Sequence, residues 1–224
     1  SKGGTVYHKN FVSFVVTDGK LPAGVSIIEK AANAYSDAKW SLKKWEIMGG
    51  KKVNGAGNGS FTYSFEGKSS GAKSGYLLME LAAKELFFKD RAGSEIKNTD
   101  YMLGAKAEPS QNQNSYPMTD EKKFPSNLKV FVDGALVKTV TLEDDPADHR
   151  GILSWHNQLQ NRKLSEAGSY GYMVKIPLTK AQIKSLEKTG KLSVKLSVDN
   201  GGGLAVYGKE FGRYAFDPSI VWMK

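Results

Sequence analysis

Cysteine is absent from the 224-residue sequence. Disulfides, thiolate zinc sites, iron–sulfur ligation and cysteine nucleophiles are therefore excluded. Long apolar runs are also lacking, since stretches such as 11–16 and 76–79 are far too short to span a bilayer. No H-E-x-x-H zinc motif occurs. Residues 1–4 are interpreted as an expression remnant or a cut at a domain boundary, so no address in the sequence indicates a localisation.

Charge of one sign is in modest excess, with 32 Lys plus Arg against 23 Asp plus Glu and a net charge of +9. The basic residues alternate with acids along the chain and form pairs such as Lys43-Lys44, never a run of five. This pattern argues against nucleic acid, and no membrane partner is expected. Most lysines are expected on a solvated surface, and their diffuse positive field would favour an acidic polysaccharide as ligand.

Short segments in which apolar and polar residues alternate dominate the sequence. Strands are predicted over 5–16, 61–65, 170–176, 191–198, 204–207 and 219–223, which are rich in β-branched and aromatic residues. Residues 128–140 predict a hairpin around Asp133-Gly134. Residues 181–188 predict a short helix between an N-cap at Thr179 and a stop at Gly190. The sequence thus predicts an all-β fold, an antiparallel β-sandwich with one or two short helices, as a single domain over 1–224.

Four segments are harder to interpret. Residues 24–45 are ambiguous, because alanines at helical spacing are interrupted at Ser36-Asp37. The glycine-rich stretch 49–60 is predicted to be a loop between strands. Residues 76–90 suit a helix by propensity but a strand by context. The polar stretch 100–124 is predicted to be a functional or mobile loop.

The densest chemistry lies in residues 143–156 (EDDPADHRGILSWH), and three interpretations stay open. Asp144, Asp145 and Asp148 offer hard oxygen ligands for a calcium ion, although the spacing is not that of an EF-hand. His149 with a tyrosine could act as acid and base in a lyase. Alternatively, the acids cap backbone amides in a proline-containing turn and pair with Arg150.

A second constellation lies in residues 207–222, where Tyr207, Arg213 and Tyr214 are candidates for ligand binding. Aromatic rings stack on the apolar faces of pyranoses, and a neighbouring Arg can bond sugar hydroxyls or carboxylates. The same reasoning makes Trp155 a stacking candidate, with His149, Arg150 and His156 as its polar neighbours, and adds Trp40 and Trp45. Each ring taken alone is more often part of a core.

Several segments of the sequence resemble domains of a known family. The segment LKVFVDGALVKTVTL (128–142) looks like the hairpin of galactose-binding-like jelly-roll domains, and residues 175–196 are similar to a later strand unit of that family. The segments 144–156, 167–178 and 202–221 together resemble accessory β-sandwich domains of large secreted bacterial glycan-degrading enzymes. The resemblance covers roughly residues 128–224 and, more weakly, 50–90.

The resemblance implies a non-catalytic carbohydrate-binding module with a structural calcium ion, tethered to a glycoside hydrolase or lyase and located outside a bacterial cell. The expected partners are a polysaccharide and the parent catalytic domain in the same chain, and an isolated module is expected to be a monomer. Two alternatives remain. One is a jelly-roll polysaccharide lyase acting on a uronate-containing glycan through His149, Tyr170 and Arg150. The other is a purely structural accessory domain.

Overall fold

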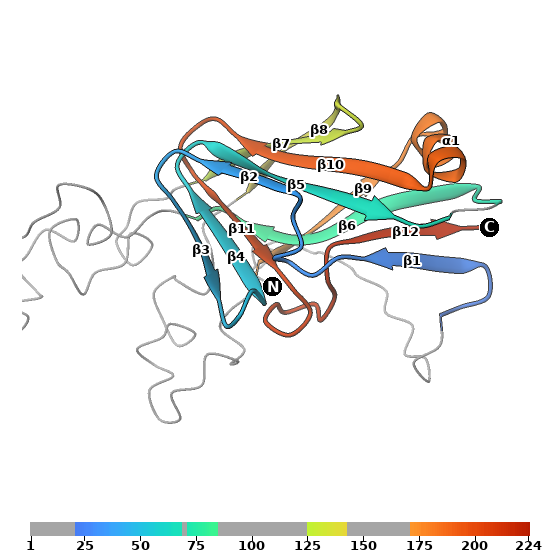
Figure 1. Cartoon of the computed structure of the whole chain (residues 1–224), viewed down its shortest axis with the longest axis horizontal. Helices are drawn as coiled ribbons and strands as arrows, with labels where there is room; N and C mark the ends of the chain where they lie inside the picture. Colours follow the sequence, from blue (N-terminus) through green and yellow to red (C-terminus); the bar gives the residue numbers. More distant parts are fainter. Residues whose placement is uncertain (1–20, 69–70, 85–124, 143–170) are drawn as a thin grey trace, which may run out of the picture.

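The computed structural model describes residues 21–68, 71–84, 125–142 and 171–224, which form β-strands and one short α-helix (Figure 1). The elements are β1 (Val25–Glu29), β2 (Asp37–Trp40), β3 (Lys43–Ile47), β4 (Lys52–Ala56), β5 (Gly59–Glu66), β6 (Ser74–Ala82), β7 (Ser126–Val132), β8 (Ala135–Leu142), β9 (Tyr172–Pro177), α1 (Lys180–Thr189), β10 (Lys191–Val198), β11 (Leu204–Tyr207) and β12 (Ser219–Met223). No helix in this part of the chain is long and apolar enough to cross a membrane.

The strands form two layers, which Figure 1 shows one above the other. The first sheet has seven strands in the order β1-β12-β6-β11-β4-β3, with β9 on the other edge of β6. The second sheet has five, in the order β2-β5-β10-β7-β8. All pairings between these strands are antiparallel. The antiparallel β-sandwich predicted from the sequence is therefore confirmed.

The core lies between the two sheets and follows from the alternation of the sequence. Along β10, every second side chain is buried and the intervening ones face solvent or are half-buried. Phe61, Tyr63 and Phe65 point inward from β5 with no exposed surface. Because side chains alternate across a strand, a period-2 pattern places one whole set in the core, where burial of the apolar area stabilises the fold.

The two local predictions with defined turn chemistry are confirmed. Strands β7 and β8 form the hairpin, and Asp133 (φ 47°) with Gly134 (φ 81°) takes the positive φ angles of a type I′ turn. Thr179 caps α1 in a capping box with Gln182, and Gly190 ends the helix in the left-handed conformation (φ 70°).

The prediction of a loop over 49–60 is wrong, because the stretch contains all of β4 and the start of β5. β4 is fully buried and lies between β3 and β11. Gly55 gives the reason for a glycine within a strand: a Cβ there would lie 2.0 Å from the indole of Trp40. The glycines mark a close approach between layers, which composition alone does not distinguish from a loop.

The two ambiguous segments also become strands where they are described. Residues 74–82 form β6, which pairs with β9, β11 and β12, so tertiary pairing overrides the helical propensity. Residues 25–47 form β1, β2 and β3. The predicted strand over 5–16 and the polar stretch 100–124 lie outside the described residues.

The first sheet divides at one edge of β6. β12 pairs with residues 74–78 of this edge, and β11 pairs with residues 80–82 further along it. β4 and β3 continue from β11, whereas β1 continues from β12. The connection between β11 and β12, residues 208–218, must therefore leave the sheet where it divides. This loop, here called the β11–β12 loop, carries two of the residues predicted to bind a ligand.

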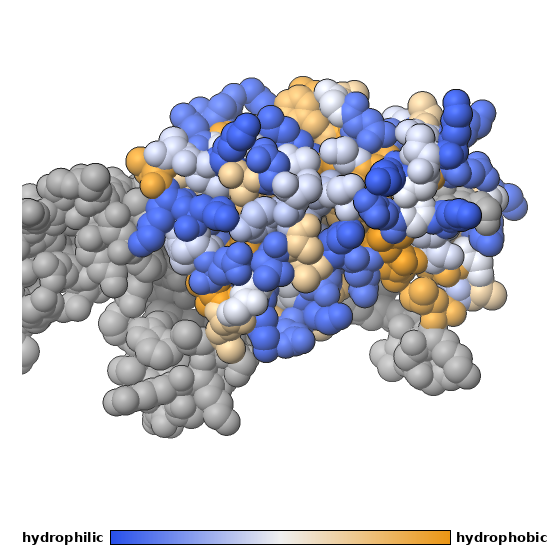
Figure 2. All heavy atoms as spheres, in the orientation of Figure 1, coloured by the Kyte–Doolittle hydropathy of each residue, from blue (hydrophilic) through white to orange (hydrophobic). Residues whose placement is uncertain are grey.

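The surface of the sandwich suits an aqueous environment. The face in Figure 2 is mostly hydrophilic, and its apolar side chains lie in small separate groups. Among the described residues, the large apolar side chains that are exposed come from different elements and include Leu42 and Leu136. Scattered exposed apolar residues of this kind are ordinary and indicate no binding surface by themselves.

Candidate functional site

A buried carboxylate holds the β11–β12 loop on the sheet. Glu80 lies on β6 directly opposite Tyr207 and has no exposed surface. Its Oε1 accepts hydrogen bonds from the backbone N–H groups of Gly171 (2.7 Å) and Arg213 (2.8 Å), and its Oε2 accepts one from Tyr214 (3.0 Å). Two of these donors belong to the loop and the third precedes β9, so one carboxylate fixes the backbone of the loop against the neighbouring strand.

Glycine at position 212 allows this approach. A Cβ at Gly212 would lie 2.2 Å from Oε2 of Glu80, so a larger residue would force the carboxylate or the loop to shift. The peptide that follows is the Arg213-Tyr214 pair that the sequence analysis singles out.

The held loop presents an aromatic pair next to a cation. The rings of Tyr214 and Phe216 are stacked, with centroids 6.1 Å apart and an interplanar angle of 30°. Both side chains are half-buried, and Arg213 is exposed. Ala215 between them has a positive φ of 52°, a backbone conformation that sets the two rings on the same side. The arrangement offers an apolar face and hydrogen-bond donors at one place.

Tyr207 has a different position from the other two predicted residues. It has no exposed surface, its ring lies 6.3 Å from that of Phe211, and Nζ of the buried Lys52 lies 4.4 Å from its centroid. The structure therefore gives Tyr207 a supporting role beneath the loop, and the prediction that it contacts a ligand has no support from its burial.

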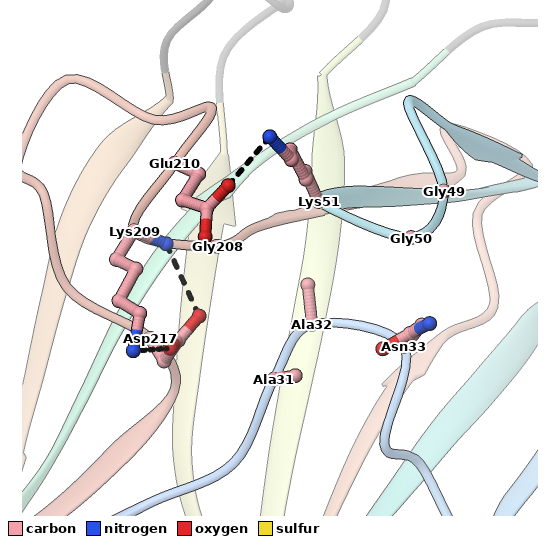
Figure 3. A pocket seen from close by; sticks show the side chains of 10 residues that line it. All are labelled: Ala31, Ala32, Asn33, Gly49, Gly50, Lys51, Gly208, Lys209, Glu210 and Asp217. Carbon is pink, nitrogen blue, oxygen red and sulfur yellow. Dashed lines mark hydrogen bonds and ion pairs between the residues drawn. The ribbon is translucent and has the colours of Figure 1, made fainter.

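A pocket lies at the place where the first sheet divides. Its volume is about 290 Å³, and it is bounded by the β1–β2 loop, the β3–β4 turn and the start and end of the β11–β12 loop. Figure 3 shows Lys51 and Glu210 reaching toward each other from two sides of it. The lining residues are Ala31, Ala32, Asn33, Gly49, Gly50, Lys51, Gly208, Lys209, Glu210 and Asp217.

The walls of the pocket are tied to the core and to one another. The hydroxyl of Tyr63, from the opposite sheet, donates a 2.6 Å hydrogen bond to the carbonyl of Ala32. Burial raises the pKa of the Tyr63 phenol well above its usual value, so this donor stays protonated. The N–H of Gly208 donates to the carbonyl of Lys51 (2.8 Å), which joins the loop to the β3–β4 turn.

Two ion pairs lie at the pocket, one joining the β3–β4 turn to the β11–β12 loop and one within that loop. Nζ of Lys51 lies 2.5 Å from Oε2 of Glu210, and Nζ of Lys209 lies 3.2 Å from Oδ2 of Asp217. The hydrogen bond from Lys51 lowers the pKa of the Glu210 carboxyl, and the hydrogen bond to Asp217 raises the pKa of the Lys209 ammonium. Each shift favours the charged form of its group, so Glu210 and Lys209 each stay charged opposite a partner of the other sign.

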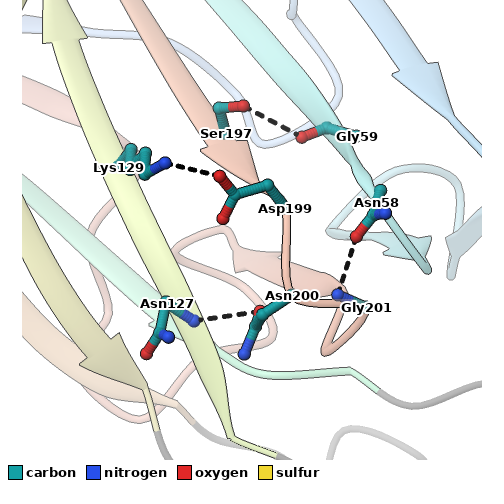
Figure 4. A network of polar contacts seen from close by, with 8 residues as sticks. All are labelled: Asn58, Gly59, Asn127, Lys129, Ser197, Asp199, Asn200 and Gly201. Carbon is teal, nitrogen blue, oxygen red and sulfur yellow. Dashed lines mark hydrogen bonds and ion pairs between the residues drawn. The ribbon is translucent and has the colours of Figure 1, made fainter.

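A second polar cluster ties strand ends together and leaves little to offer a ligand (Figure 4). Oδ1 of Asn200 accepts from the N–H of Asn127 (3.1 Å), and its Nδ2 donates to the carbonyl of Pro125 (3.0 Å). Oδ1 of Asn58 accepts from the N–H of Gly201 (2.7 Å). These amides satisfy backbone groups at turns, which is a structural task.

The two described stacking candidates among the tryptophans differ. Trp40 lies between the layers, with its ring centroid 5.1 Å from that of Phe61 and its indole against the backbone at Gly55 and Gly59. Trp40 is therefore partly buried and packs against the core. Trp45 lies half-buried on the edge strand β3, with Nζ of Lys43 at 5.7 Å from its ring.

The remaining predicted site residues lie outside the described part of the chain: Asp144, Asp145, Asp148, His149, Arg150, Trp155, His156 and the lyase candidate Tyr170. Their roles stay predictions. Among the residues that the structure does describe, no three His, Asp or Glu side chains are grouped so that they could hold a metal ion.

Sequence reasoning missed Glu80 and the pocket. Glu80 lies within the segment 76–90, where an acid is ordinary on a helix, and only the strand assignment makes an inward carboxylate unusual. The pocket residues come from three separate connections, so no local pattern joins them. The one available signal was the concentration of glycines around residues 49–50 and 201–212.

The fold and the loop define an antiparallel β-sandwich protein with an aromatic and polar site on a connection between strands. No protein-family model matches the sequence, and no curated protein matches it. Solved structures of carbohydrate-binding modules are similar. A family 35 module from an environmental isolate is 14% identical with a TM-score of 0.38, covering 89% of this chain and 93% of that one.

Two further structures belong to the same class of protein. A family 35 module from Cellvibrio japonicus is 10% identical with a TM-score of 0.40, covering 89% of this chain and 93% of that one. A family 6 module from Clostridium cellulolyticum, in complex with xylose, is 11% identical with a TM-score of 0.34, covering 89% and 97%. This is the class that the sequence resemblance names, but so low an identity assigns no binding residue in this chain.

Proposed function

We propose that the chain is a non-catalytic carbohydrate-binding module that binds a polysaccharide with the β11–β12 loop. One observation carries this proposal: the stacked pair Tyr214–Phe216 lies beside the exposed Arg213 on a backbone held by the buried Glu80. Burying a carboxylate only to fix three backbone amides costs free energy, and a loop without a task does not require it. A preorganised loop lowers the ordering cost of binding.

The chemistry of the loop suits a sugar. The C–H face of a pyranose packs on aromatic rings, and the hydroxyls at its rim accept hydrogen bonds from a guanidinium. Arg213 could also bind the carboxylate of a uronic acid, and the net charge of +9 would favour such a glycan. The proposed ligand is therefore a polysaccharide, with acidic or substituted chains favoured.

Replacing Tyr214 by alanine tests the loop. We expect at least a roughly tenfold loss of affinity, because a stacking ring contributes more than its area alone. Native affinity electrophoresis against neutral and acidic polysaccharides measures it. Tyr76, a half-buried tyrosine on β6 with Nζ of Lys175 at 4.2 Å from its ring, gives the control Tyr76→Ala. Equal retardation of both variants and the original chain would contradict the proposal.

The same mixtures distinguish binding from cleavage. A lyase would create unsaturated uronate and a rising ultraviolet absorbance, whereas a binding module retards without new absorbance. Retention without absorbance is the expected result.

The proposal includes a calcium ion held by Asp144, Asp145 and Asp148, a location outside the cell, and a parent glycan-degrading enzyme. These parts rest on the sequence alone. Carboxylate oxygens suit calcium, and a bound ion would stabilise the folded state by mass action. We therefore expect the melting temperature to fall when a chelator removes calcium. Asp144→Asn with Asp145→Asn should remove that difference, and unchanged melting in chelator would exclude the ion.

A further inference from the structure

We infer that the pocket bounded by Ala31–Asn33, Gly49–Lys51, Gly208–Glu210 and Asp217 is a second subsite, which takes one uncharged sugar unit. The inference rests on the proposed glycan binding, and it names what this part of the surface recognises. The pocket and the Tyr214–Phe216 pair belong to the same loop, since Lys209, Glu210 and Asp217 line the pocket from its two ends.

The size of the pocket restricts what it can hold. About 290 Å³ is at the lower end of the range of small-molecule sites, which is enough for a single ring and its hydroxyls. The walls cannot widen freely, because Tyr63 holds Ala32 from the core and Gly208 is bonded to Lys51. Nor can they close with larger residues, since a Cβ at Gly50 (φ 92°) would lie 2.0 Å from the Asn33 amide.

The polar groups of the lining match a polyol. Each ammonium has three donors, and the ion pairs of Lys51 and Lys209 leave some of them available. In the part of the chain described, the amide of Asn33 makes no hydrogen bond within the protein, so it can donate and accept. The lining therefore offers both donors and acceptors to the hydroxyls of a sugar.

The charges of the lining argue against a charged sugar. Lys51 and Lys209 are each paired with a carboxylate, and the pKa shifts of Glu210 and Lys209 favour the charged forms of these two groups. A uronate would find no unpaired cation among the lining residues that the structure describes, because each ammonium already faces a carboxylate that would repel the added negative charge. The methyls of Ala31 and Ala32 and the backbone of Gly49 and Gly50 supply an apolar side for the ring.

The test fills the pocket without touching the charges. Ala31 is exposed and lines the pocket, whereas Ala34 is exposed on the same loop and does not line it. Ala31→Phe is the test variant and Ala34→Phe its matched control. The probes are the methyl pyranosides of glucose, galactose, mannose and xylose, with glucuronic acid as the charged comparison. Amide chemical shifts of Gly50 and Gly208 are followed up to tens of millimolar sugar.

We expect at least one neutral pyranoside to shift both glycine amides in the original chain and in Ala34→Phe. In Ala31→Phe its apparent affinity should fall by roughly tenfold or more, and glucuronic acid should not shift these amides in any variant. Sugar-induced chemical shift changes that are confined to residues 213–216, and that are the same in Ala31→Phe as in the original chain, would overturn the proposed pocket subsite. They would leave the loop proposal intact. Retardation by a polysaccharide, with no sugar-induced shift of the Gly50 and Gly208 amides, would also overturn the pocket subsite and leave the loop proposal intact. Absence of both responses would overturn the two proposals together.

Discussion

Replacing Glu80 by alanine should lower the free energy of unfolding by about 4 kcal/mol and abolish glycan binding by the β11–β12 loop. The carboxylate accepts from the N–H groups of Gly171, Arg213 and Tyr214. A buried donor left without its acceptor costs about 1–3 kcal/mol, and three such donors lose theirs at once. Part of the cost is recovered if the loop moves out to water, but this movement removes the aromatic pair from its position. Chemical denaturation and affinity electrophoresis measure the two effects.

Two variants separate the clamp from a general loss of charge. Glu80→Gln keeps an acceptor oxygen and the volume, so it should lose less stability than Glu80→Ala and retain weak binding. Glu46→Ala removes an exposed acid that, within the described part of the chain, accepts from the Tyr35 hydroxyl alone (3.2 Å), and it should stay within about 0.5 kcal/mol of the original chain. If the Glu80→Ala variant unfolded at the same denaturant concentration as the original chain, the three hydrogen bonds would not anchor the loop.

The β-sandwich could be predicted from the sequence because its strongest signals are local. Alternation along 191–198 needs only the period of a strand, and Asp133-Gly134 needs only the φ angles of a tight turn. β4 could not be predicted in this way, because Gly55 is required by the ring of Trp40, which lies 15 residues away in the sequence. A contact across layers leaves no pattern within either segment.

The same contrast applies to the site. Arg213 and Tyr214 could be singled out because aromatic and basic residues flanked by glycine are a local pattern. Glu80 acts on them from more than a hundred residues away, and the pocket combines three connections. Their association depends on the division of the first sheet at β6, which is a property of strand order. Sequence reasoning names the groups that a loop presents, and the topology decides what holds them.

Trp40 and Trp45, both half-buried, test the difference between an aromatic ring packed against the core and one on an edge strand. Both were stacking candidates in the sequence, and they lie on neighbouring strands in the chain, β2 and β3. Trp40→Ala should lower the free energy of unfolding by about 3 kcal/mol, because its ring packs on Phe61 and on the glycine backbone of both layers. Trp45→Ala, on an edge strand, should cost less than about 1 kcal/mol. Denaturant titration of the two variants measures the difference.

The indole N–H of Trp40 allows a second and more specific variant. Its Nε1 is buried without a hydrogen-bond partner among the described residues, so part of what the ring contributes by packing is offset by an unpaired donor. Trp40→Phe removes that donor and keeps an aromatic ring over Gly55, and it should therefore recover more than half of the stability lost in Trp40→Ala. Glycan affinity should be unchanged in Trp40→Phe, because the ring lies between the sheets and not on the β11–β12 loop. If Trp40→Ala were as stable as Trp45→Ala but failed to bind glycan, Trp40 would be a ligand contact and its place against the core would be wrong.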